Sequence, residues 1–482
     1  MGSKAQMSAR DRIVTLLDEN SFVEVGAEVT KRSTDFNMSE VKAPSDGVIT
    51  GFGVVNGNPV YVYSQDATVL GGSIGEMHAR KIARIYDLAM KTGVPVVGLV
   101  DCSGMRLEES TDALAAFGSI FKKETLASGV IPQITAIFGN CGGGSAILAS
   151  LSDIVVMEKN SAKLFVNCPN TIKGNYEGKL DTASAAYMSA NGNVDLVGED
   201  EADVINKVRT IIDYLPLNNE DDPSAAERGE DLNRSLDNLE NELADSAAAL
   251  CDIADAGSFI ELKKDYGMDI VTAFIKLNGV TTGAIANRRK YNGADGKVIS
   301  EFDGRMSAQA CEKAAGFVKL CDAFGIPLLT LVDVEGFAAD KNESRLGKAA
   351  AKLAFAFADA TVPKISVIAG KAYGSAYIAM NSKHVGADMV FAYSDAKVGT
   401  MDSELAVQIM YADEIAKDSS GKKKADMAAQ YDALAQSAAS AAARGYVDQI
   451  IEKPDTRKHI IYAFEMLYTK RETRLSKKHG TV

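Results

Sequence analysis

The sequence is poor in the residues that most metal enzymes and proton relays depend on. Its 482 residues include only four histidines, and its six cysteines form no CxxC pair. Structural zinc sites are normally built from such pairs. We therefore expect no metal site and no histidine-centred catalysis.

Long apolar runs and a basic excess are also missing. No stretch reaches the roughly 18 consecutive apolar residues of a membrane span. Residues 1–12 lack the apolar core of a secretory signal. A formal net charge of −13 disfavours non-specific nucleic-acid binding, although a local basic spot could still hold a nucleotide-bearing ligand. These features predict a soluble, cytoplasmic, globular protein.

The chain instead contains an internal repeat, spaced at about 230 residues. Residues 93–101 and 325–333 are both apolar runs that follow a Gly-x-Pro sequence and end in aspartate, 232 positions apart (333 − 101). Five further matches, some before and some after this pair, occur in the same order in both halves. Apolar runs after such breakers are typical of buried parallel strands, and helical segments lie between them. We predict two diverged copies of one α/β unit: residues 1–222, a linker and helix over 223–250, and residues 251–482.

Each copy contains a strand that runs into a helix through small residues. These turns are residues 139–145, which include Gly142, Gly143 and Gly144, and residues 370–376, which end in Gly374-Ser375-Ala376. Such a turn leaves backbone N–H groups open at a helix N-terminus, where they can stabilise an oxyanion. Tight helix–strand packing is the alternative. Neither turn carries the Lys-Ser/Thr of a phosphate-binding loop.

A third small-residue segment, residues 70–76, leads into a predicted helix that starts near His78. Its Gly71, Gly72 and Ser73 could border the same cavity, although a plain helix start fits as well. Asp101 and Asp333 end their strands, where they could either brace a loop or contact substrate.

Together, these segments resemble the biotin-dependent acyl-CoA carboxyltransferases. The likeness covers nearly the whole chain. It includes residues 65–78 (QDATVLGGSIGEMH), 101–109, 139–145, 321–327, 332–337, 360–377, 382–388, 443–448 and 477–480.

The resemblance implies two tandem crotonase-like domains of the ClpP/crotonase ββα-superhelix type. The N-terminal domain would hold the acyl-CoA and the C-terminal domain the biotin of a separate carrier protein. It also implies a hexamer built as a trimer of dimers, with active sites between the two kinds of domain of different chains. Biotin itself would act as the base.

By this resemblance, the amides of Gly143 and Gly144 would hold the thioester enolate, and those of Gly374, Ser375 and Ala376 the biotin ureido oxygen. The predicted substrate-binding residues are Gly71, Gly72, Ser73, Gly104, Met105, Gly142, Tyr373, Tyr377 and Ile378.

Several positions depart from the family pattern. Cys102 and Met105 replace small residues, Ser375 replaces a glycine, and the loop at residues 336–340 lacks the usual Pro-Gly. Ile378 stands where many propionyl-specific members carry aspartate. An apolar side chain at this position would change acyl selection.

Other polar residues have simpler interpretations. Arg106 could meet a CoA phosphate or be a solvated arginine beside Glu108 and Glu109. Asp153 and Asp388 are expected to be structural, and His384 to be a surface or satisfied histidine.

The chain lacks a Met-Lys-Met biotinylation sequence and an ATP-binding carboxylase module. We therefore expect a biotin carboxyl carrier protein as a partner. The other partner would be a biotin carboxylase, or a sodium-pump decarboxylase if the reaction runs backward. The alternatives are an enoyl-CoA hydratase or isomerase of the crotonase type, and an inactive scaffold of this fold.

Overall fold

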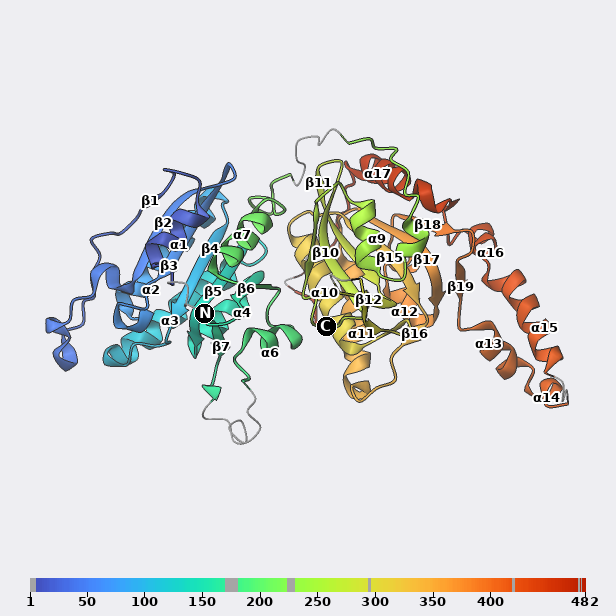
Figure 1. Ribbon diagram of the computed structural model, residues 1–482, viewed down its shortest axis with the longest axis horizontal. Coiled ribbons are helices and arrows are strands. Elements are labelled where there is room, and N and C mark those ends of the chain that lie inside the picture. The colour runs from blue at the N-terminus through green and yellow to red at the C-terminus, as the bar shows by residue number, and fades with distance from the viewer. Residues whose placement is uncertain are drawn as a thin grey trace. The chain divides into compact units, whose positions relative to one another are not determined.

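The computed structural model describes residues 6–169, 181–222, 230–293, 296–417, 421–475, 477 and 479–482. It divides into two compact units, Met1–Asp222 and Pro223–Val482 (Figure 1). Each unit is built around its own mixed sheet.

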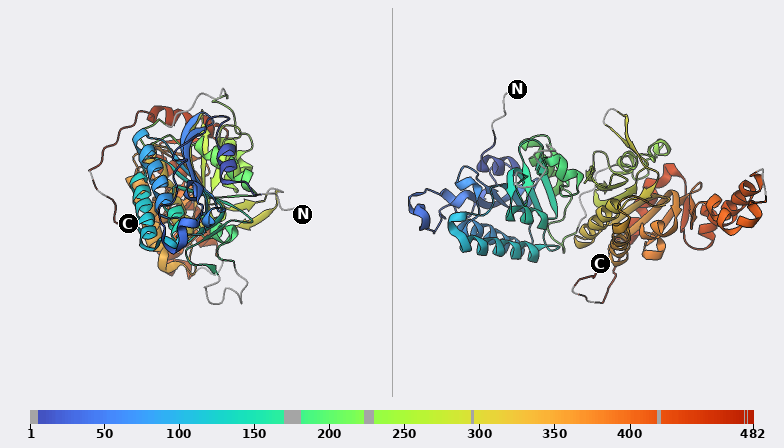
Figure 2. Two further views of the ribbon diagram at one scale, coloured as in Figure 1. Left: turned by 90° about the vertical axis from the view of Figure 1, so that its left-hand side faces the viewer. Right: turned by 90° about the horizontal axis from the view of Figure 1, so that it is seen from below.

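The first unit is a sheet with helices on both faces (Figure 2). Its strand order is β1-β2-β3-β4-β5-β6-β8, with β7 added beside β5, and every pairing from β3 onward is parallel. Its elements are α1 (Ala9–Leu16), β1 (Val23–Glu24), β2 (Val48–Val55), β3 (Asn58–Gln65), α2 (Glu76–Thr92), β4 (Val96–Cys102), α3 (Ser110–Ala127), β5 (Gln133–Gly142), α4 (Gly144–Leu151), β6 (Ile154–Glu158), β7 (Lys163–Phe165), α6 (Ala185–Ala190), β8 (Leu196–Gly198) and α7 (Glu201–Ile212).

The second unit repeats this order strand for strand. Read from the other edge, its sheet runs β9-β10-β11-β15-β17-β18-β20, with β19 beside β17. The predicted duplication and α/β class are therefore confirmed. Its elements are α8 (Leu239–Glu242), α9 (Ser246–Ile253), β9 (Phe259–Leu262), β10 (Ile270–Leu277), β11 (Val280–Asn287), β12 (Lys290–Asn292), β13 (Val298–Glu301), β14 (Arg305–Met306), α10 (Ala308–Ala323), β15 (Leu328–Val334), β16 (Gly336–Phe337), α11 (Glu343–Asp359), β17 (Lys364–Tyr373), α12 (Gly374–Ala379), β18 (Met389–Tyr393), β19 (Lys397–Gly399), α13 (Ser403–Met410), α14 (Ala412–Ile415), α15 (Lys422–Tyr431), α16 (Ala438–Ala443), β20 (Gln449–Ile451) and α17 (Thr456–Leu467).

Both copies close their first hairpin in the same way. An Asn-Gly pair with positive φ at both residues forms the turn, as the right-handed twist of two-residue hairpins requires. In the first unit the Asp18 carboxylate accepts the N–H groups of Asn56 and Gly57, each at 3.0 Å. In the second unit Asp255 binds the corresponding turn at 3.0 and 2.7 Å. The aspartates and turns that match in sequence therefore make equivalent hydrogen bonds in the two units.

A buried lysine is repeated as well. Lys81 on α2 donates to the Val48 carbonyl at the start of β2, and Lys313 on α10 donates to the Ile270 carbonyl of β10 at 2.9 Å. Burial lowers the pKa of each lysine to about 8. These lysines lie 232 positions apart (313 − 81). In each unit the lysine therefore holds an equivalent helix to an equivalent strand.

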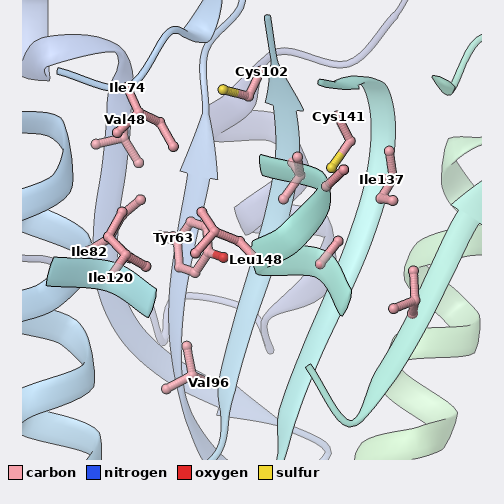
Figure 3. Packing of buried hydrophobic residues seen from close by; sticks show 14 of the residues in the cluster. Val48, Tyr63, Ile74, Ile82, Val96, Cys102, Ile120, Ile137, Cys141 and Leu148 are labelled. Atoms are coloured by element: carbon pink, nitrogen blue, oxygen red, sulfur yellow. The ribbon is translucent and has the colours of Figure 1, made fainter. Parts of the chain in front are cut away.

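The first core lies between the sheet and helices α2, α3 and α4. Figure 3 shows Ile82, Ile120 and Leu148 packed over Tyr63 and Val96 of the sheet. Apolar side chains of α1 and α7 are buried as well, outside this cluster. Strand β4 is buried along its whole length, as the sequence predicts.

Much of the predicted linker and helix, residues 223–250, belongs to the second unit. Leu236, Leu239 and Leu250 are buried in the core of the second unit, so residues 230–250 pack as part of that domain. Among the predicted helical residues 231–250, two short helices form, α8 and the start of α9.

Glu124 on α3 provides a test of this core. Its side chain is buried, and its Oε1 accepts a long hydrogen bond of 3.4 Å from the Tyr86 hydroxyl. Among the described residues, its Oε2 has no hydrogen-bond partner. Burial therefore raises the pKa of Glu124 well above its ordinary 4.5. The folded state holds this proton more tightly than the unfolded state, so stability is lost as pH rises above about 4.5.

We expect Glu124→Gln to unfold at a higher temperature than the wild type at pH 7–8, with the difference vanishing toward pH 4. Thermal unfolding across this range measures it, and the exposed Glu199→Gln serves as the control. A pH-independent difference would contradict the assignment.

Candidate active site

The first turn joins β5 to α4 through Gly143. Its φ of 59° and ψ of −124° suit only glycine. A Cβ at Gly144 would lie 2.7 Å from the Phe117 ring, and one at Gly142 would lie 2.9 Å from the Phe165 ring. Gly143 therefore requires glycine for its conformation, whereas a side chain at Gly142 or Gly144 would displace a phenylalanine ring.

The second turn repeats this geometry between β17 and α12. Gly374 has φ 63°, Ser375 is exposed and Ala376 is buried. One helical turn later Ile378 is 43% exposed, as is Ile147 at the equivalent place in the first unit. Both turns therefore open to solvent beside an isoleucine.

The amide of Gly143 is already occupied. Its N–H donates to the Phe165 carbonyl at 2.9 Å, continuing the pairing of β5 with β7. This contradicts the prediction that the Gly143 amide binds an oxyanion, and Gly143 is instead the pivot of the turn. The Gly144 N–H opens helix α4, where the first N–H groups lack helical acceptors and the helix dipole is positive.

A second candidate amide comes from the loop after β4. Ile74 donates to the Gly104 carbonyl at 2.9 Å and accepts from the Arg106 N–H at 3.0 Å. Met105 lies between these two bonds in a parallel bridge with Ile74, so its own N–H points to the opposite side.

The loop and the first turn lie against each other. A Cβ at Gly104 would be 3.3 Å from the Gly142 carbonyl oxygen. The N–H groups of Met105 and Gly144, from two separate elements, are therefore the candidate pair of donors for one oxyanion.

The second unit has the same loop. Phe337 pairs with Met306, whose carbonyl accepts the Ala338 N–H at 2.9 Å. The Phe337 N–H therefore points away from this bridge, as that of Met105 does. Sequence reasoning missed Phe337, although the 232-residue spacing (337 − 105) would have identified it.

Asp101 and Asp333 brace the turns. Asp101 accepts the Asn140 N–H at 3.2 Å, and Asp333 accepts the Lys371 N–H at 2.8 Å. A Cβ on the glycine before each donor would lie 2.1 and 2.6 Å from these carboxylates. The structure thus supports the bracing role. Asp153 and Asp388 likewise accept one backbone N–H each, at 2.8 Å.

Arg106 fits neither sequence-based alternative, because its side chain is fully buried. It pairs with Asp46 at 2.6 Å and Glu109 at 2.8 Å, and donates to the Ser73 carbonyl at 2.9 Å. The second oxygens of both carboxylates accept N–H groups from the start of α2. This cluster joins residues 70–76 to residues 103–109 and so fixes the loop that presents Met105.

His78 is a poor candidate for a general base. His78 Nδ1 donates to the Asp46 carbonyl at 2.9 Å, so Nε2 accepts from the Gln65 amide at 3.1 Å. Burial lowers the pKa of His78 to about 3. His384 packs against Tyr377 with ring centroids 6.2 Å apart. In the described part of the chain, no group of three or more His, Cys, Asp or Glu side chains is placed to hold a metal.

Charged side chains line the edge of the second turn. Arg289 forms a bidentate pair with Asp333 at 2.6 and 2.7 Å, and both Arg289 and Lys371 reach Glu335 at 2.9 Å. Partial burial would raise the pKa of Glu335, but these hydrogen bonds lower it. Sequence patterns carry no signal for this cluster, because its members are far apart in the chain.

The other predicted residues border these sites. Gly71 is exposed and accepts the Ser103 N–H at 3.0 Å, and a Cβ at Gly72 would be 2.1 Å from the Asp101 carbonyl. Tyr373 and Tyr377 are 2% and 3% exposed.

Comparisons with known proteins identify the family to which the chain is similar. A family model described as the carboxyl transferase domain matches residues 2–482. The chain is 37% identical to the propionyl-CoA carboxylase beta chain of Roseobacter denitrificans, over 99% of the chain and 94% of that protein. It is 38% identical to the methylmalonyl-CoA decarboxylase subunit alpha of Veillonella parvula, over 100% of the chain and 94% of that protein.

The crystal structure of a transcarboxylase 12S with hydrolysed methylmalonyl-coenzyme A bound superposes with a TM-score of 0.92 at 35% identity. The match covers 99% of the chain and 92% of the transcarboxylase chain.

Proposed function

Because the chain belongs to the carboxyl transferase family, we propose that it moves a carboxyl group between carrier-bound biotin and a short-chain acyl-CoA. The substrate pair is propionyl- and methylmalonyl-CoA, or acetyl- and malonyl-CoA. One observation supports the proposal: in each crotonase-like unit a bridged loop and a strand–helix turn follow two paired parallel strands. The proposed reaction passes through one anion on the acyl-CoA side and one on the biotin side.

The first unit would hold the acyl-CoA. Loss of the α-proton moves negative charge onto the thioester oxygen, which the N–H groups of Met105 and Gly144 would stabilise. Because Gly104 and Gly142 have no side chains, the loop and the turn can approach closely enough for both N–H groups to reach one oxygen. The adjoining Gly71, Gly72 and Ser73 would border the substrate.

The second unit would hold biotin. The residues fit a neutral ureido ring, because Ser375 and Ala376 are small and the charges of Arg289 and Lys371 are already paired. The amides of Gly374, Ser375 and Ala376, with that of Phe337, would face the ureido oxygen. When bound, biotin supplies the CO2 and the base.

In the proposed hexamer each active site would combine the first unit of one chain with the second unit of another, so residues near the second turn would also shape the acyl pocket. Ile378 is exposed, whereas Tyr373 and Tyr377 are buried. We assign Ile378 to acyl-chain selection because it offers an apolar surface beside the turn.

The assembly would be a homo-hexamer, by analogy with the hexamer that the transcarboxylase 12S forms. In the second unit, helices α13 to α15 project away from the sheet (Figures 1 and 2). Helix α13 exposes Leu405 and Ile409, at 50% and 63%, and Leu434, which follows α15, is 66% exposed. Another copy of the chain would cover this apolar surface. The partners would be a biotin carboxyl carrier protein and either a biotin carboxylase or sodium-pump decarboxylase subunits.

Within the described residues, no helix has both the length and the apolar character that crossing a bilayer requires. We propose a cytoplasmic enzyme.

The test is carboxyl transfer by the purified chain. Methylmalonyl-CoA or malonyl-CoA, labelled in the free carboxyl group, is incubated with biotin or a biotinylated carrier. We expect label to move to biotin. Hydration of an enoyl-CoA without biotin would indicate a hydratase instead, and binding without turnover would indicate an inactive scaffold.

A further inference from the structure

Cys102 lies where the loop and the turn of the first site meet. It is the last residue of β4 and is fully buried. Its Sγ accepts the Gly104 N–H at 3.3 Å and faces the Ser145 hydroxyl at 3.1 Å. Gly104 precedes Met105, and Ser145 follows Gly144. One sulfur atom therefore contacts both elements that supply the candidate amide donors.

We propose that Cys102 is a positioning residue of the acyl-CoA site. Its sulfur holds the Met105 loop and the N-terminus of α4 at the separation that lets both amides reach one enolate oxygen. This inference rests on the proposed function and adds a residue to that site.

The second unit shows that the fold does not require this contact. The equivalent of Cys102 is Val334, 232 positions later (334 − 102), and both face the turn strand in matching register. The equivalent of Ser145 is Ala376, 231 positions later (376 − 145). Both partners are replaced together, so the sulfur–hydroxyl bridge belongs to the first site alone.

The thiol suits this place because it stays neutral. Burial raises the pKa of Cys102, although the hydrogen bonds from Ser145 and Gly104 act in the opposite direction. A neutral sulfur accepts N–H and O–H groups without placing negative charge beside a developing enolate.

Cys141 provides a matched control. It sits beside Cys102 on β5, is equally buried and belongs to the same core (Figure 3). No hydrogen bond from its thiol to the loop or to α4 is found among the described residues.

The experiment uses a double-mutant cycle on the full chain: Cys102→Ala, Ser145→Ala and the double variant, with Cys102→Ser and Cys141→Ala. Two quantities are measured. One is kcat and KM for carboxyl transfer from methylmalonyl-CoA to biotin. The other is the infrared carbonyl stretch of bound propionyl-CoA carrying 13C in the thioester, which reports polarisation by the two amides without turnover.

We expect Cys102→Ala to lower kcat by about 10- to 100-fold, the range that a displaced donor can produce, with KM within about twofold. Its carbonyl stretch should move toward that of free thioester. Ser145→Ala should act in the same direction, and the double variant should lose less than the product of the two single effects. Cys102→Ser, which keeps an acceptor, should recover most of kcat, and Cys141→Ala should leave kcat within about threefold of the wild type.

Three results would overturn the inference. They are equal losses at Cys102 and Cys141, a rise in KM with unchanged kcat, or an unshifted carbonyl stretch in both single variants. If the wild type transfers no carboxyl group, the proposed function fails, and the carbonyl stretch still decides whether Cys102 positions the amides. If Cys102→Ala does not fold, Ser145→Ala removes the same contact and carries the test.

Discussion

Gly144→Pro is expected to lower kcat for carboxyl transfer by about 100- to 1000-fold, the loss seen when one oxyanion donor is removed. Proline has no N–H and is favoured at the first position of a helix, which Gly144 occupies in α4. The preceding Gly143 tolerates the restriction that proline places on its neighbour, because glycine reaches its mirror-image extended conformation. The fold should survive while the donor is lost.

Gly144→Ala is the matched control. It adds the same Cβ, 2.7 Å from the Phe117 ring, but keeps the N–H. We expect alanine to cost stability and at most about tenfold in kcat, since the displaced ring can shift. Steady-state kinetics on both variants, with circular dichroism to verify folding, separates the two effects. Equal losses in kcat would show that the Gly144 amide does not stabilise the transition state.

Arg106→Met is expected to be the most damaging single change to the first unit. It leaves Asp46 and Glu109 buried without their cation, and breaking a buried ion pair costs about 3–5 kcal/mol. Hydrogen exchange should rise first in residues 70–76 and 103–109, because the Arg106 guanidinium joins these segments. Activity should fall with it, because the loop that presents Met105 loses its anchor.

Arg80→Met is the control for this change. Arg80 pairs with Glu76 at 2.7 Å, but its side chain is 59% exposed. Exposed pairs of this kind contribute about 0–1 kcal/mol. Similar hydrogen exchange in the two variants would mean that the Arg106 cluster does not hold the loop.

The architecture was predictable because the signals for it are local or repeated. Apolar runs after Gly-x-Pro predicted β4 and β15, and small residues after β5 and β17 predicted both turns. The spacing of the repeat aligned the two units before any contact was known.

The errors concern partners that lie far apart in the chain. Arg106 stands beside Glu108 and Glu109 in sequence, but its buried partner Asp46 is 60 positions away. The Gly143 amide was predicted to be free because Phe165, which accepts it, belongs to another strand. Sequence patterns identify the elements, whereas these contacts depend on which elements the sheet brings together.

The hydrogen bonds at the two hairpin turns should protect their asparagines from deamidation. In flexible peptides an Asn-Gly pair is prone to deamidation, because the glycine nitrogen attacks the asparagine side chain to close a succinimide ring. In both units this nitrogen donates its hydrogen to a carboxylate, that of Asp18 or Asp255. A backbone nitrogen held in this way is a poor nucleophile and cannot turn toward the side chain. The folded enzyme should therefore keep both asparagines through long storage, and isoaspartate at these sites would mark molecules that have unfolded.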